Sequence, residues 1–289
     1  MSVCRHAGPN IVFGSFYREG RKMLEEIIMW AKRQEQVRAL VLEGSLAKQQ
    51  GVDELSDLDI NVWFSGELLF GRTVEWLKEI GDVLIETQLR MDSPAGEVAT
   101  QLVIFQNGIK VDFSFWPITF LETPFPYYDK MEILIDKDMH TEQIKRCVQE
   151  RSKLPMTKLI FDKIVNEFWF ELHYVAKFLK REEIWFVQSI QAGIRENYLL
   201  PLLEEQARIA GRNTSFSGRN IEAWLNSVHL ERLPSIFAGY SLEANWQAMW
   251  EEIALFEDIS HFISTYYQFE LPIATIEGMK NLLRKIQEG

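Results

Sequence analysis

Strand-like and helix-like patterns alternate only in the first half of this 289-residue chain, and this division constrains the fold more than any other feature. Short apolar runs between turn residues predict strands, whereas apolar residues spaced three and four positions apart predict helices. The expected strands are Val37 to Leu42, Leu58 to Phe64, Asp82 to Leu89, Gln101 to Gln106 and Lys110 to Trp116, and the expected helices are Phe16 to Gln34 and Thr73 to Ile80. Asn107 and Gly108 form a typical hairpin turn before the last strand. The first half therefore predicts a mixed sheet with helices.

The second half has helical periodicity and no convincing strand. The expected helices are Thr157 to Arg181, Trp185 to Ala210, Asn220 to Asn226, Leu242 to Phe269 and Ile276 to Gln287. The segment from Ser152 to Pro155 marks the change of pattern and predicts a linker. We therefore expect an α/β (α+β) fold of two domains, in which residues 1–150 contain the mixed sheet and residues 151–289 form a helical bundle.

Composition narrows the class of protein further. The hydrophobic fraction of 47% predicts a folded, globular protein, and the net charge of -11 offers no general attraction for nucleic acid or for an anionic membrane. No apolar stretch reaches membrane-spanning length, and Cys4 and Cys147 are too few for a disulfide framework. We therefore expect a cytoplasmic protein that binds neither nucleic acid nor membrane and that suits a cationic small molecule. Its oligomeric state stays open.

Two aspartates mark the beginning of the second expected strand. Because side chains alternate between the faces of a strand, Asp57 and Asp59 project to the same side while Leu58 and Ile60 enter the core. Neighbouring carboxylates repel each other unless a hard cation lies between them, and Mg²⁺, which prefers oxygen ligands, is the natural occupant. The pair therefore predicts a magnesium site.

Three further residues extend this site. Asp112 alternates with Val111 and Phe113, so it points away from their apolar face, where it would share the metal or accept the proton of an attacking hydroxyl. Gly44 lets the backbone approach a phosphate, and Ser45 offers a hydroxyl and an amide to hold it. The arrangement predicts an in-line displacement at phosphorus, catalysed by positioning and charge neutralisation.

The order of these motifs resembles the DNA polymerase beta superfamily of nucleotidyltransferases, in which a Gly-Ser turn precedes Asp-x-Asp and a later single aspartate. Over most of the chain the sequence also resembles the streptomycin 6-adenylyltransferase group of aminoglycoside-modifying enzymes. The segments that carry this likeness are Ala39 to Ser45, Ser56 to Ile60, Ile80 to Asp82, Asn107 to Asp112, Asn166 to Trp169 and Tyr174 to Lys177. Leu46 departs from the group, which commonly has arginine directly after the Gly-Ser pair.

The resemblance implies an enzyme that transfers AMP from ATP to a streptomycin hydroxyl and releases pyrophosphate. It implies Asp57 and Asp59 as Mg²⁺ ligands and Asp112 as the third catalytic carboxylate, which also matches a metal ligand. Residues 1–150 would form the nucleotidyltransferase domain, and residues 151–289 would complete the nucleotide and substrate cleft.

Candidate nucleotide contacts also lie in the second half. Tyr174 and Lys177 share one face of the helix expected from Thr157, and the resemblance implies that they face the nucleotide. Arg212 and Arg219 belong to a polar loop that resembles the loop bringing a basic residue to the phosphates in this family. Which arginine serves stays open, and the alternatives are an ordinary solvated helix face and an ordinary helix connection.

The acceptor candidates are carboxylates that would pair with its cationic groups and indoles that would stack on its sugar rings. They are Glu86, Glu97, Trp116, Trp169 and Glu171. Two other functions stay open. One is the same chemistry on another small molecule, such as a lincosamide or a metabolite. The other, suggested by Leu46, is a nucleotide-binding regulatory protein without transfer activity.

Overall fold

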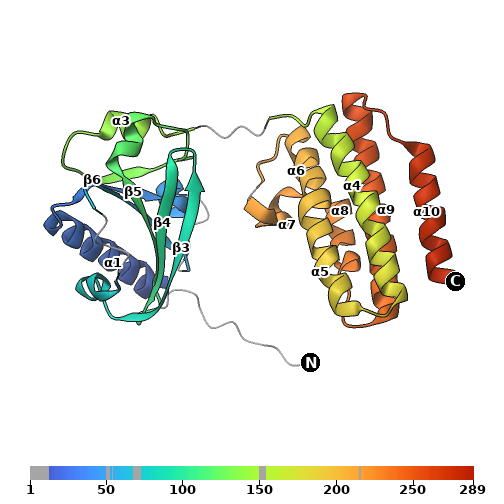
Figure 1. The fold of residues 1–289 in the computed structure, drawn as a ribbon, viewed down its shortest axis with the longest axis horizontal. Coiled ribbons are helices and arrows are strands. Elements are labelled where there is room, and N and C mark those ends of the chain that lie inside the picture. The colour runs from blue at the N-terminus through green and yellow to red at the C-terminus, as the bar shows by residue number, and fades with distance from the viewer. Residues whose placement is uncertain (1–12, 50–52, 54, 68–72, 150–153, 215) are drawn as a thin grey trace. The chain divides into compact units, whose positions relative to one another are not determined.

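The computed structural model describes residues 13–49, 53, 55–67, 73–149, 154–214 and 216–289. The chain divides into two compact units, residues 1–151 and residues 152–289 (Figure 1). The first unit contains the sheet and the second contains only helices and turns in its described part. The expected fold class, a mixed sheet with helices followed by a helical region, is confirmed.

A sheet of six strands forms the centre of the first unit, in the order β3-β4-β5-β2-β1-β6. The strands are β1 (Val37–Glu43), β2 (Leu58–Phe64), β3 (Val83–Ser93), β4 (Gly96–Phe105), β5 (Lys110–Pro117) and β6 (Glu132–Asp136). The pair β2 and β5 is parallel, while the other four neighbouring pairs are antiparallel. The five strands expected from the sequence are present, and the structure adds the edge strand β6.

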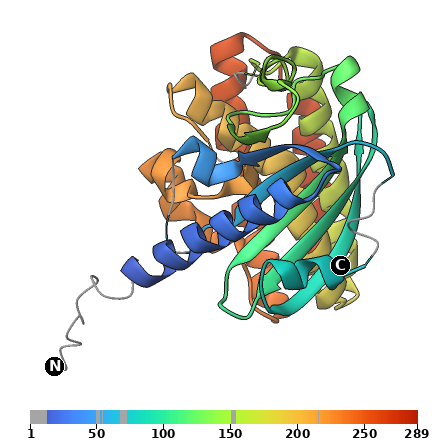
Figure 2. The same ribbon diagram turned by 90° about the vertical axis from the view of Figure 1, so that its left-hand side faces the viewer.

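Each face of the sheet is covered by different elements (Figure 1 and Figure 2). Helix α1 (Phe13–Arg33) and the 3-10 helix η1 (Glu75–Glu79) pack on one face, through side chains such as Trp30 and Trp76. The 3-10 helix η2 (Ile118–Glu122) and helix α3 (Thr141–Lys145) pack on the other face, through Leu121 and Ile144. We call these the α1 face and the α3 face. Strand alternation decides which residues reach each one.

One expected helix of the first unit is wrong in type. The stretch from Thr73 to Ile80 contains the five-residue 3-10 helix η1 instead of an α-helix. Such a short segment forms too few hydrogen bonds to offset the cost of starting an α-helix. The 3-10 helix ends at Glu79, two residues before Gly81. Its two buried side chains, Trp76 and Leu77, account for the helix-like spacing in the sequence.

The second unit is a helical bundle around one core. Its long helices are α4 (Lys158–Lys180), α5 (Ile184–Ile194), α6 (Leu200–Ile209), α9 (Leu242–Tyr267) and α10 (Ile273–Glu288), and its short ones are α7 (Ile221–Trp224), α8 (Ser227–Arg232), η4 (Phe216–Gly218) and η5 (Leu233–Ile236). The single helix expected from Trp185 to Ala210 is interrupted by a π-helical turn, η3 (Arg195–Leu199). Pro201, which lacks a backbone N–H, lies just beyond that turn and explains the change of hydrogen bonding. In the parts described, no helix has both the length and the apolar character needed to cross a membrane.

Candidate active site

A row of acidic side chains crosses three neighbouring strands of the first unit. In the register of the sheet, Glu43 of β1 pairs with Asp59 of β2, and Asp59 pairs with Asp112 of β5. Asp57 lies directly before β2 and approaches the same site. Residues that pair directly share a face, and this row lies on the α3 face, opposite Leu58, Ile60 and the other α1-face residues. The structure therefore brings together the three aspartates predicted from the sequence.

Gly44, in the turn after β1, leaves room for the carboxylate of Asp59. It has a φ of +73°, in the left-handed region, and it begins the short helix α2 (Gly44–Lys48). A Cβ atom on Gly44 would lie 1.9 Å from Oδ2 of Asp59. The position therefore needs glycine for two reasons, its backbone conformation and the carboxylate beside it. Ser45 follows in the first turn of α2.

Lys110 is a member of the site that the sequence reasoning missed. It lies two residues before Asp112 in β5, on the same face, and its Nζ donates a hydrogen bond of 2.8 Å to Oδ2 of Asp57 and another of 2.8 Å to Oδ2 of Asp112. The signal that would have found it is the Lys-x-Asp spacing itself, which places both side chains on one side of a strand. Lys110 therefore brings a positive charge into the acidic row.

The pKa of Asp59 lies above its ordinary value. Burial raises its pKa to about 6, and the nearby negative charges of Asp112 and Asp57 add to that rise. Lys110 acts in the opposite direction, but it is hydrogen-bonded to the other two aspartates. The ionised form of such a buried carboxylate, which has negative neighbours, is stabilised when another cation binds nearby.

Glu43 is a fourth acidic member of the row and was not among the predicted residues. Burial raises its pKa to about 7, while a hydrogen bond of 3.1 Å from the hydroxyl of Tyr127 acts in the opposite direction. It was overlooked because, as the last residue before Gly44, it reads as the end of an apolar strand. The structure shows that its side chain lies beside Asp59 rather than in solvent.

The donor chemistry of this row fits a hard divalent cation. Asp57, Asp59 and Asp112 supply carboxylate oxygens, which are the ligands that Mg²⁺ prefers. Oδ1 of Asp112 is buried and lies 2.8 Å from Nζ of Lys110 as an ion-pair contact, but among the described residues the hydrogen bond to this carboxylate is made to Oδ2. Yet no three His, Cys, Asp or Glu side chains among the described residues are already arranged around a metal position. Lys110 holds two of the three aspartates in its own hydrogen bonds.

Three nucleotide candidates of the second unit, Tyr174, Arg212 and Arg219, are exposed, and Lys177 is half-buried. Tyr174 is 39% exposed on α4, and the ammonium of Lys177 lies 5.5 Å from the centre of its ring. Arg212 donates hydrogen bonds to the carbonyls of Trp224 and Leu225, which fastens the loop to the end of α7. The guanidinium of Arg219 is exposed and forms no hydrogen bond or ion pair with the other residues that the structure describes. The guanidinium of Arg219 is therefore available to a ligand, whereas that of Arg212 already binds two carbonyls.

Two of the five acceptor candidates are buried, and two lie on the α1 face, away from the aspartates. Trp116 is 1% exposed and donates a hydrogen bond of 2.7 Å to Asn61, and Trp169 is 3% exposed in the core of the helical bundle. Glu86 pairs with Val103 on the α1 face, opposite the aspartates. Glu97 lies on that same face, towards the other end of β4, where it forms an ion pair with Arg90.

Glu171 remains available as an acceptor contact. It lies half-buried on α4, and together with Glu167 it raises the pKa of Tyr198 on η3, although burial is the larger cause. The two carboxylates therefore lie near one phenol on the surface of the second unit. Such a group suits a ligand that carries ammonium or guanidinium groups.

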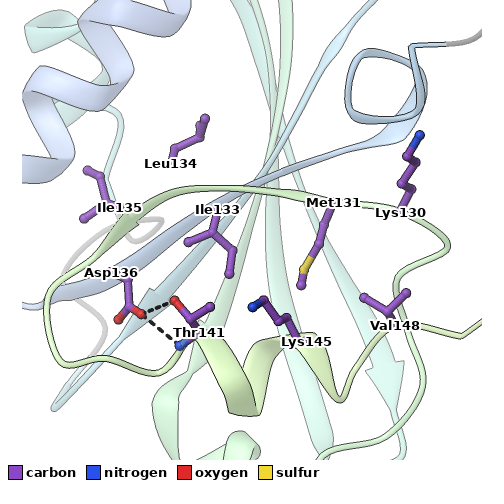
Figure 3. A pocket seen from close by; sticks show the side chains of 9 residues that line it. All are labelled: Lys130, Met131, Ile133, Leu134, Ile135, Asp136, Thr141, Lys145 and Val148. Atoms are coloured by element: carbon purple, nitrogen blue, oxygen red, sulfur yellow. Dashed lines mark hydrogen bonds between the residues drawn. The ribbon is translucent and has the colours of Figure 1, made fainter.

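A groove of about 640 Å³ lies elsewhere in the first unit, between the edge strand β6 and helix α3 (Figure 3). It is lined by Lys130, Met131, Ile133, Leu134, Ile135, Asp136, Thr141, Lys145 and Val148. Asp136 accepts hydrogen bonds from the backbone and hydroxyl of Thr141 and thereby fixes the start of α3. The groove contains none of the residues predicted for catalysis, so its size alone does not make it the active site.

A carboxylate row beside a Gly-Ser turn, on a mixed sheet followed by a helical unit, is the arrangement that the resemblance to nucleotidyltransferases implies, and the comparisons with known proteins identify an adenylyltransferase, an enzyme of that class. The chain belongs to the streptomycin adenylyltransferase family, whose model matches residues 17–286. The sequence is 26% identical over 268 residues to an aminoglycoside 6-adenylyltransferase of Bacillus subtilis (strain 168), covering 88% of this chain and 93% of the relative. It is 24% identical over 271 residues to a protein of the same name from Campylobacter jejuni, covering 89% and 92% respectively. A crystal structure of an aminoglycoside 6-adenyltransferase from Bacillus subtilis aligns at a TM-score of 0.46 and 22% identity, over 93% of this chain and 98% of the other.

Proposed function

We propose that the protein transfers AMP from Mg²⁺-bound ATP to a hydroxyl of an aminoglycoside, with streptomycin as the first candidate, and releases pyrophosphate. The observation that carries this proposal is the row of Asp57, Asp59 and Asp112 beside Gly44 and Ser45, in a member of the streptomycin adenylyltransferase family. The relatives named aminoglycoside 6-adenylyltransferase support the class of acceptor. An enzyme that uses ATP in this way would work in the cytoplasm.

The proposed chemistry assigns a role to each residue of the row. Asp57 and Asp59 would hold Mg²⁺, which when bound neutralises phosphate charge and polarises the phosphorus. The acceptor oxygen forms a bond to the α-phosphorus while the bond from that phosphorus to the bridging oxygen breaks, so pyrophosphate leaves. Asp112 would take the hydroxyl proton or share the metal, and Ser45 would hold phosphate oxygens.

The second unit would supply further contacts to both substrates. In this proposal residues 1–150 form the catalytic domain, and Tyr174, Lys177 and Arg219 of residues 151–289 bind the nucleotide. Arg219 is preferred to Arg212 because the guanidinium of Arg212 already holds the carbonyls of the loop. Glu171 would bind a cationic group of the acceptor, since it lies beside another carboxylate and Tyr198.

Pyrophosphate release from Mg²⁺-ATP tests the proposal. The acceptor panel contains streptomycin, other aminoglycosides and lincosamides, and the two variants are Asp59→Asn and, as a matched control, Asp92→Asn at an exposed position of β3. We expect release that requires streptomycin, that persists in the control and that falls by at least about 100-fold in Asp59→Asn.

The other outcomes of this assay are also decisive. Release with a lincosamide or another aminoglycoside, but not with streptomycin, would revise the acceptor and keep the chemistry. Release that survives equally in Asp59→Asn would reject the assigned site. Binding of ATP without release for any acceptor would reject transfer and favour a regulatory protein.

A further inference from the structure

The cation nearest the carboxylate row belongs to the protein itself. Nζ of Lys110 lies 2.8 Å from Oδ2 of Asp57 and 2.8 Å from both carboxylate oxygens of Asp112. These distances are those of charge-assisted hydrogen bonds. One ammonium therefore bridges two carboxylates that come from different segments of the chain.

The sheet enforces this bridge. Lys110 and Asp112 are two residues apart in β5 and so project from the same face, while the parallel pairing of Leu58 with Val111 brings the start of β2 beside Lys110. Asp57, the residue before Leu58, is thus held next to the lysine. The three side chains are between one quarter and two fifths exposed, so water and small ions reach them.

A divalent cation at this site needs the same oxygens. Asp57 is one of the two residues proposed to hold Mg²⁺, and its Oδ2 accepts the hydrogen bond from Lys110. An oxygen that accepts a hydrogen bond from an ammonium offers less electron density to a metal, and the positive charge of that ammonium repels the metal. As the side chains stand, no three acidic residues among those described form a finished metal site.

We propose that Lys110 is a built-in counter-ion of the site, which holds Asp57 and Asp112 together in the absence of a divalent cation and must leave Asp57 when one binds. This inference rests on the proposed function, since it concerns the same metal site. Metal binding and release of Lys110 from Asp57 are then one equilibrium. The lysine has a flexible four-carbon stem, so its ammonium can move to a triphosphate oxygen without a change in the strand.

Binding of Mn²⁺ alone tests this inference without any nucleotide or turnover. It is measured from the electron paramagnetic resonance signal of the free ion. The variants are Lys110→Met, which removes the competing cation, and Lys110→Arg, which retains it. Lys48→Met is the matched control, because Lys48 also lowers the pKa of Asp59 through space but is ion-paired with Asp129 at 2.6 Å. The Lys48→Met variant therefore measures the effect of losing one positive charge near the row.

We expect Lys110→Met to bind Mn²⁺ about tenfold more tightly than Lys48→Met, a difference of about 1.4 kcal/mol, and Lys110→Arg to resemble the wild type. We also expect Mn²⁺ to raise the thermal midpoint of Lys110→Met by more than that of the wild type, because the two aspartates then lack their ammonium. A lysine with a merely structural role would lower the midpoint equally with and without Mn²⁺.

Two results would overturn the inference, and they can be told apart. If Mn²⁺ binds to all variants and Lys110→Met gains no more affinity than Lys48→Met, the lysine is not a competitor, although the metal site stands. If Mn²⁺ binds to none of the variants, the metal site of the proposed function is rejected together with the counter-ion.

Discussion

Substitution of Gly44 by alanine should disable the site. The free energy of unfolding should fall little more than it does when alanine replaces any other glycine with a left-handed backbone. The new Cβ would lie 1.9 Å from Oδ2 of Asp59, against 3.4 Å for ordinary van der Waals contact, so the carboxylate has to move by roughly 1.5 Å. Misplacement of a reacting group by about 1 Å costs on the order of 100-fold in rate. We therefore expect kcat/KM for pyrophosphate release to fall by at least about 100-fold, or about 2.7 kcal/mol.

Gly66→Ala is the matched control for this experiment. Gly66 also has a positive φ, +80°, but the nearest atom to a new Cβ there is Nε2 of Gln36 at 3.7 Å, which is ordinary contact. Both variants should lose about 1–2 kcal/mol in the free energy of unfolding, measured with urea, because alanine is strained in the left-handed region. Activity of Gly44→Ala within about threefold of Gly66→Ala would refute the reasoning, since a displaced Asp59 could not then matter.

Two pairs of variants test the second unit. Arg219→Met should raise the KM for ATP by about tenfold or more without changing the urea midpoint, whereas Arg212→Met should mainly lower the midpoint because two carbonyls lose their donor. Burial raises the pKa of Glu252 to about 8 against an ordinary 4.5, and Arg195 only partly offsets that rise. The folded state therefore keeps a proton that the unfolded state loses, so the free energy of unfolding should fall between about pH 5 and pH 8. Glu252→Gln should reduce this fall by up to roughly 4 kcal/mol in urea titrations, Glu251→Gln should not, and an unchanged pH dependence in Glu252→Gln would contradict the assignment.

The three aspartates could be predicted from the sequence because local rules place them. Asp57 and Asp59 flank an apolar residue at the start of a strand, and Asp112 alternates with two apolar neighbours. Alternation alone then sends the aspartates to one face and the apolar residues to the other. The parallel pairing of β2 with β5, which sets Asp59 directly beside Asp112, is a property of the whole sheet and needed the structure.

Lys110 and Glu43 escaped prediction because their roles depend on that pairing. The Lys-x-Asp spacing places Lys110 on the face of Asp112, but Lys110 meets Asp57 from 53 positions away in the sequence, and that contact follows from the pairing of β2 with β5. The same dependence decides on which face the acceptor candidates of the sheet lie. The residue type of Glu86 suits an acceptor contact, but the face of β3 on which Glu86 lies follows from its partner Val103, which packs on the α1 face.

Leu46 stands where the family commonly has arginine, and the structure shows where this residue packs. Its side chain packs against the core of the α1 face, on the side of the sheet away from the carboxylate row. Lys48, two residues further on, already pairs with Asp129. Among the described residues, the cation that is hydrogen-bonded to the row is therefore Lys110, which comes from a different strand. If the family's arginine serves the phosphates, this chain has to supply that charge from β5 or from the helical unit, and loss of Lys110 should then weaken ATP binding even as it strengthens binding of Mn²⁺ alone.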